Sequence, residues 1–104
     1  MIYNLVTTVY KPGKTNESQE IFNKEMIPLF PKFGQKLVGS FRAYTGNMNE
    51  VYQLFAYEDL AARQRSREAY LKNEQYQQAS AKLTALTVSQ TMTLIEPNDW
   101  SPMK

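Results

Sequence analysis

The chain alternates between segments of strand-like and helix-like hydrophobic period, and the order of these segments restricts its fold more than any other feature. Residues 2–10 are rich in β-branched and aromatic side chains and end at a Lys-Pro-Gly-Lys turn, which predicts a strand. Residues 15–33 then carry apolar side chains at spacings of three and four, which predicts an amphipathic helix. Pro28 and Pro31 lie near the end of that helix, so its last turns are expected to be irregular.

The middle of the chain predicts a hairpin. Residues 36–45 and 50–57 have strand-like compositions, and a short Gly-Asn-Met-Asn turn lies between them. Asp59 then stands where the N-cap of a helix over residues 60–71 is expected.

The last third of the chain predicts a short helix over residues 74–83 and a final strand over residues 85–95, where apolar side chains alternate. The overall order is β-α-β-β-α-β, with the short helix added. This order predicts the α+β class: a ferredoxin-like unit with a four-stranded antiparallel sheet. We expect one domain over residues 1–97 and a polar C-terminal tail over residues 98–104.

Both faces of the predicted sheet are apolar, although the helices can cover only one of them. In the third strand, one parity carries Val51, Phe55 and Tyr57, and the other carries Tyr52 and Leu54. The uncovered face is therefore expected to pack against a second copy, giving a homodimer. On this hypothesis, Phe55→Lys yields insoluble protein or monomers.

The composition excludes several classes of function. The chain contains no Cys and no His, so it lacks the usual ligands of zinc and iron–sulfur sites, and we expect no metal and no cofactor. Twelve basic and ten acidic residues are interspersed, which predicts no nucleic-acid partner. No apolar run approaches the roughly 20 residues of a membrane span, and no signal peptide is recognisable, so a cytoplasmic protein is expected.

Three stretches of the chain resemble the NIPSNAP family. They are the first strand with the Lys-Pro-Gly-Lys turn, residues 33–39 (FGQKLVG), and residues 49–63 (NEVYQLFAYEDLAAR). The resemblance covers about residues 1–96 and implies a dimeric α/β barrel, in which two sheets face each other. The family has no established reaction. Tyr76 departs from the many relatives that carry a tryptophan there, and the one Trp of this chain, Trp100, lies in the tail.

Two arginines are the strongest candidates for binding an anion. Arg63 and Arg67 are four residues apart in the predicted helix, so they share a face and could hold a carboxylate or phosphate between them. The alternative is that both are solvated and form ion pairs with Glu58, Asp59 or Glu68.

Aromatic strand residues are candidates for the wall of a ligand pocket. Tyr3, Phe41, Tyr44 and Tyr57 are the residues that we assign to this role, because related α/β-barrel proteins often hold an apolar ligand between sheet and helices. The alternative is ordinary packing in the core and the dimer interface.

Three functions remain open from the sequence. The first is a homodimeric domain that binds a small, partly apolar molecule. The second is a cofactor-independent monooxygenase or isomerase-like enzyme, for which Asn4 alone is a weak basis and no catalytic residue can be assigned. The third is an RNA-binding domain, which fits poorly because the aromatic segment around Phe41 lies on the second strand rather than the third.

Overall fold

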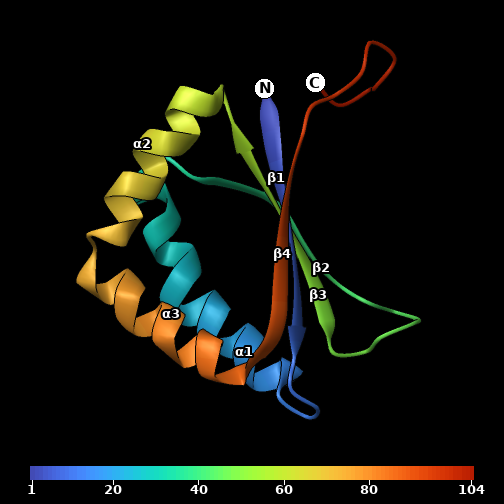
Figure 1. The fold of residues 1–104 in the computed structure, drawn as a ribbon, viewed down its shortest axis with the longest axis vertical. Coiled ribbons are helices and arrows are strands. Elements are labelled where there is room, and N and C mark those ends of the chain that lie inside the picture. Colours follow the sequence, from blue (N-terminus) through green and yellow to red (C-terminus); the bar gives the residue numbers. More distant parts are fainter.

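Four antiparallel strands form a single sheet in the order β2-β3-β1-β4. The strands are β1 (Ile2–Tyr10), β2 (Lys36–Arg42), β3 (Glu50–Tyr57) and β4 (Thr87–Ile95). The computed structural model describes all residues 1–104, and Figure 1 shows the helices α1, α2 and α3 on one side of the sheet. The predicted ferredoxin-like α+β fold is confirmed.

The first helical segment changes pitch twice along its length. It begins as α1 (Thr15–Ile21), widens into the π-helical turn η1 (Phe22–Met26), and tightens into the 3₁₀ segment η2 (Ile27–Phe33). The two prolines of η2 lack a backbone N–H group and therefore disturb the regular hydrogen-bond ladder. Gly34 ends the segment at φ 72°, a left-handed conformation that favours glycine. The predicted irregular end of this helix is confirmed.

Side-chain caps set the start of both later helices. The Asp59 carboxylate accepts a hydrogen bond from Ala62 N at 2.8 Å, so α2 (Leu60–Leu71) begins where predicted. Asn73 caps α3 (Glu74–Leu86) in the same way through Tyr76 N, also at 2.8 Å. Helix α3 is three residues longer than the predicted 74–83, and β4 accordingly begins at Thr87.

The hairpin also differs from its prediction. Strand β2 ends at Arg42 rather than residue 45, and its register against β3 shifts between Leu37 and Gly39. Such an irregularity twists the strand locally and shortens the regular pairing. The residues after β4 form no further helix or strand. None of the helices has both the length and the apolar content to cross a membrane.

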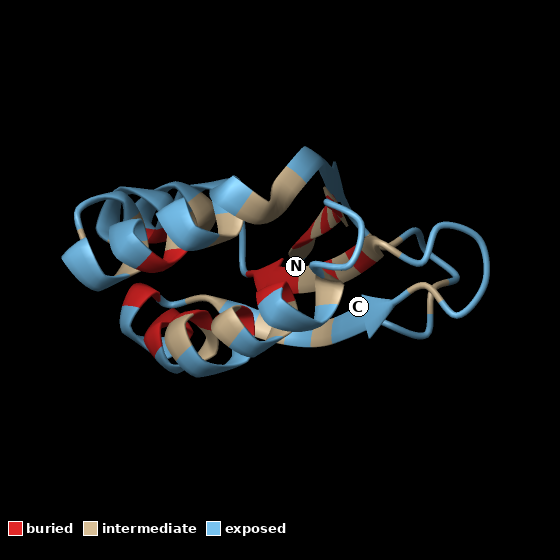
Figure 2. Ribbon diagram, turned by 90° about the horizontal axis from the view of Figure 1, so that it is seen from below, coloured by how far each residue is buried: buried red, intermediate tan, exposed pale blue.

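The core lies between the sheet and the helices, as the band of buried residues in Figure 2 shows. Strand pairing places Asn4 opposite Phe55 and Val6 opposite Gln53, so the even positions of β1 and the odd positions of β3 face the helices. The core cluster consists of Val6, Phe22, Met26, Phe30, Phe55, Tyr57 and Ala79. Phe30 packs its ring edge-on against Phe55 with centroids 5.2 Å apart.

This register corrects the choice of Phe55 as a probe of the uncovered face. Phe55 belongs to the core, so Phe55→Lys would disrupt the core rather than a dimer interface. The outer face instead carries Leu5, Tyr52 and Leu54, which are half-buried, and Phe41, which is exposed. Both parities of β3 are apolar, and only its pairing with β1 under the helices shows which parity points inward.

Candidate functional site

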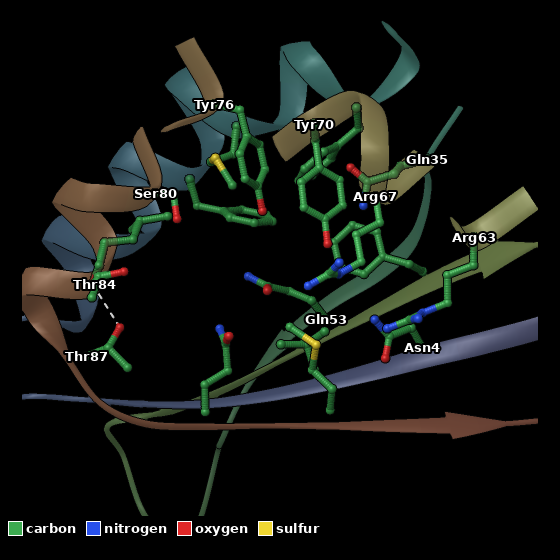
Figure 3. Close-up of a pocket in the computed structure, with 18 of the residues that line it drawn as sticks. Asn4, Gln35, Gln53, Arg63, Arg67, Tyr70, Tyr76, Ser80, Thr84 and Thr87 are labelled. Atoms are coloured by element: carbon green, nitrogen blue, oxygen red, sulfur yellow. Dashed lines mark hydrogen bonds between the residues drawn. The ribbon is translucent and has the colours of Figure 1, made fainter. Parts of the chain in front are cut away.

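A cavity of about 280 Å³ lies between the sheet and the helix layer. Its floor comes from β1, β3 and β4, and its roof comes from η1, η2, α2 and α3 (Figure 3). One part of the wall is apolar and continues the hydrophobic core. That part consists of Val6, Phe22, Met26, Phe30, Phe55 and Leu83. The remaining lining is rich in phenol, amide, hydroxyl and guanidinium groups.

Three tyrosines form the aromatic side of the cavity. The Tyr57 hydroxyl accepts a hydrogen bond from Gln35 Nε2 at 3.0 Å. The rings of Tyr70 and Tyr76 lie 4.5 Å apart, and both pack edge-on against Phe33. Phe33 ends η2, so the irregular first helix and the two later helices together hold the tyrosines in place.

The hydroxyls of Tyr70 and Tyr76 keep their protons at physiological pH. Burial, reinforced by the charges that Tyr70 and Tyr57 would carry, raises the pKa of Tyr76 to about 12. Burial also raises the pKa of Tyr70, although the nearby guanidinium groups of Arg67 and Arg63 oppose the shift. These phenols are therefore hydrogen-bond donors to anything that occupies the cavity.

Two amide side chains are buried at the cavity floor without full hydrogen bonding. Asn4 is 6% exposed and Gln53 is 5% exposed, and both line the cavity. Asn4 Oδ1 and Gln53 Nε2 have no hydrogen-bond partner. A buried polar atom without a partner destabilises a fold by about 1–3 kcal/mol, and such atoms are uncommon. A molecule within the cavity, water included, would complete the hydrogen bonding of these two atoms.

Arg63 and Arg67 line the cavity from α2 and form no ion pair. The three ion pairs of the chain join Lys14 to Glu17, Lys24 to Glu20, and Lys82 to Glu25. Asp59 caps α2, and Glu68 accepts a hydrogen bond from Gln64 at 3.2 Å. Neither arginine forms an ion pair with Glu58, Asp59 or Glu68, although Arg67 is exposed to solvent, as the alternative interpretation expects.

The cavity opens to solvent beside β4. Met92 lines the cavity yet is 54% exposed, because β4 is an edge strand that the helices cover only in part. Gln90 also lines this side and donates from Nε2 to Thr8 Oγ1 at 3.0 Å. Ser80 and Thr84 contribute hydroxyl groups from α3. A small molecule could therefore enter without unfolding of the core.

The structure brings three of the predicted binding residues together and leaves the other three apart. Tyr57, Arg63 and Arg67 line the same cavity. The other three do not line it. Tyr3 is buried at the opposite parity of β1, Phe41 is 59% exposed on the outer face, and Tyr44 is 97% exposed in the hairpin loop.

Sequence reasoning missed Gln53, Tyr70 and Tyr76 as cavity residues, and it considered Asn4 only for catalysis. Gln53 could have been recognised from the sequence, since it is the one amide side chain within the apolar strand β3. Tyr70 follows Arg67 by three residues and so shares its face of α2. The proximity of Asn4 and Gln53 depends on the pairing of β1 with β3, which the sequence does not reveal.

A comparison with family models finds a match to NIPSNAP over residues 3–102. The chain belongs to the NIPSNAP family. An uncharacterized NIPSNAP domain protein from Burkholderia xenovorans superposes with a TM-score of 0.91 at 22% identity, covering 98% of this chain and 99% of that one. A NIPSNAP family protein from Agrobacterium tumefaciens gives 0.93 at 22% identity, covering 99% and 98%. No curated protein matches the chain in sequence.

More distant structures share the fold. A candidate antibiotic biosynthesis monooxygenase from Nitrosomonas europaea superposes with a TM-score of 0.73 at 11% identity, covering 93% of this chain and 98% of that one. The ferredoxin-like fold of this NIPSNAP domain is therefore shared with that protein. At this identity the likeness concerns the fold alone, since one fold hosts many functions.

Proposed function

We propose that this NIPSNAP domain binds a small, partly apolar molecule in the cavity between its sheet and helices. The observation that supports this most strongly is the pair of buried amides, Asn4 and Gln53, with unpartnered atoms beside an aromatic wall. An empty space in a core destabilises a protein, and so does an unsatisfied amide. Both features are explained together if a ligand fills the space and completes the hydrogen bonds.

The shape and lining of the cavity support a compact ligand. Its volume of about 280 Å³ lies just below the range of about 300–1,000 Å³ that is typical of small-molecule sites. The apolar end formed by Phe22, Phe30 and Phe55 suits a ring or short branched chain. The phenols and amides suit polar groups at the other end.

We further propose that the domain forms a homodimer through the outer face of the sheet. No helix covers this face, and its central residues Leu5, Tyr52 and Leu54 are only half-buried within one chain (Figure 1). Burying such apolar surface favours association. The cavity lies on the opposite side of the sheet, so ligand binding does not require the partner.

The binding function is tested by identifying what the protein carries out of the cell. Protein purified without added ligand is denatured, and the released compounds are identified by mass spectrometry. Ser80→Phe places a ring in the cavity from α3, whereas Ala81→Phe places the same ring on the exposed side of that helix. We expect a reproducible compound from the natural protein and from Ala81→Phe, and none from Ser80→Phe. The absence of any compound from all three proteins would contradict retention of a ligand.

A second candidate is a cofactor-independent monooxygenase. It is supported by the shared fold of the monooxygenase candidates from Nitrosomonas europaea and Caulobacter crescentus, and by the position of Asn4 at the cavity floor. The chain has no His for proton transfer, so a tyrosine or carboxylate would have to replace it. Oxygen uptake with a panel of hydroquinones tests this candidate, and no turnover above buffer would reject it.

A further inference from the structure

The charged residues that line the cavity are all positive, which favours a negatively charged ligand. Arg63 and Arg67 are the only charged residues that line it, and no carboxylate does so. Both guanidinium groups lack an ion pair. Arg67 is exposed, whereas Arg63 is half-buried, and a guanidinium partly removed from water without a partner is unfavourable. The cavity therefore has a positive end that the chain does not neutralise.

The arrangement of the two arginines matches a planar anion. Because they are four residues apart on α2, their side chains leave the same face of the helix. Figure 3 shows both reaching from α2 toward the cavity, with Arg67 below the hydroxyl of Tyr70. A guanidinium presents several donors in a fixed plane, which suits the oxygens of a carboxylate or phosphate. Tyr70 can add a further donor from the same helix.

The opposite end of the cavity excludes charge. Phe22, Phe30 and Phe55 belong to the core cluster, where an ionised group would lose its hydration without compensation. Asn4 and Gln53 lie on the sheet floor and offer one free acceptor and one free donor. The lining thus changes from apolar, through neutral amides, to cationic.

We propose that the ligand is an amphiphilic anion, with an aromatic or branched apolar body and a carboxylate or phosphate held by Arg63 and Arg67. This inference rests on the proposed binding function and specifies the chemistry of its ligand. The apolar body lies against the phenylalanines, and the acidic group lies at the α2 end. A polar substituent on the body completes the hydrogen bonds of Asn4 and Gln53.

The test compares probes that share one ring system and differ in charge. Binding of 2-naphthoate and 2-naphthyl phosphate is measured by calorimetry against the neutral 2-naphthamide. Each probe is applied to the natural protein, to Arg63→Gln/Arg67→Gln, and to Arg65→Gln as a matched control. Arg65 lies on the same helix but lines a different surface depression. Far-UV circular dichroism confirms that each variant is folded.

We expect at least one anionic probe to bind at least about tenfold tighter than the amide, since hydrogen bonds to charged groups contribute more than neutral ones. The double variant should lose this preference while keeping the affinity for the amide, and Arg65→Gln should retain it. Added salt should weaken the preference. The larger of the two anionic gains identifies carboxylate or phosphate as the preferred group.

Two results would overturn the inference in distinguishable ways. If the amide and the anions bind equally to the natural protein, or if the double variant keeps the preference, the anionic assignment is wrong and the binding function stands. If no probe binds and the purified protein releases no compound, the binding function is wrong and the inference falls with it.

Discussion

The two faces of the sheet differ in an unexpected way: the buried face carries polar amides, and the uncovered face carries apolar side chains. The face beneath the helices is buried, yet it presents the amides of Asn4 and Gln53. The outer face is uncovered, yet its central strands present Leu5 and Leu54. Neither pattern is what packing of a single chain requires, because buried positions favour apolar groups and solvated positions favour polar ones.

The contrast supports the two proposals, in which each face meets a different partner. Amides under a helix layer are explained by a small molecule with polar groups, while apolar residues on an open sheet are explained by a protein surface. The two proposals are therefore separable, and substitutions at neighbouring positions of β3 can test them independently.

The largest effect is expected from Phe55→Lys on the inner face. Phe55 packs against Phe30 in the core cluster, and a lysine there loses apolar contacts and buries an ammonium group. The expected destabilisation is about 5 kcal/mol or more, enough to unfold a domain of ordinary stability. Soluble yield and far-UV circular dichroism measure the outcome. A soluble Phe55→Lys protein that melts like the natural one would contradict the assignment of β3 parity.

At the adjacent position, Leu54→Lys should leave the fold intact and break the dimer. Leu54 points to the outer face, where a lysine can be solvated in the monomer but not in an apolar interface. We expect the dimer dissociation constant to rise at least about tenfold, measured by light scattering coupled to size-exclusion chromatography. Ala81→Lys, on the exposed side of α3, is the control. A dimer unaffected by Leu54→Lys would show that the outer face is not the interface.

A smaller effect of opposite sign is expected from Asn4→Leu on the inner face. Replacing an unpartnered buried amide by an apolar group of similar size removes a desolvation penalty. The ligand-free protein should become more stable by about 1–2 kcal/mol, measured by urea denaturation, while the retained compound is lost. Destabilisation instead would mean that the amide serves the fold rather than a ligand.

The smallest effect concerns pH and the cavity tyrosines. The pKa of Tyr76 lies near 12 in the folded protein, against about 10 when unfolded. Between these values the unfolded chain has lost the proton and the folded chain keeps it, so stability falls as pH rises from about 10 to 12. Tyr76→Phe should reduce this fall by about 1 kcal/mol after allowance for partial solvent exposure. Melting curves of both proteins across this range measure it, and identical slopes would contradict the burial of the phenol.

The sequence allows much of the fold to be predicted, because it depends on local signals. β1, β3 and α2 have the predicted bounds, since a turn, a cap or a change of period marks each end. The sequence does not reveal which face of β3 points toward the helices, because both sets of alternating residues are apolar. Phe55 was therefore assigned to the uncovered face, although it lies in the core. Within the site, the Arg63–Arg67 pair follows from helix spacing. The juxtaposition of Asn4 and Gln53 follows only from strand pairing over long sequence distance.

Native mass spectrometry of protein purified without added ligand tests the account most directly, because it weighs the assembly and any retained molecule together. The account predicts a species of twice the 12.1 kDa chain mass, carrying an additional small mass that Arg63→Gln/Arg67→Gln reduces and Arg65→Gln does not. A monomer without any added mass would contradict both the interface on the outer face and the ligand on the inner one.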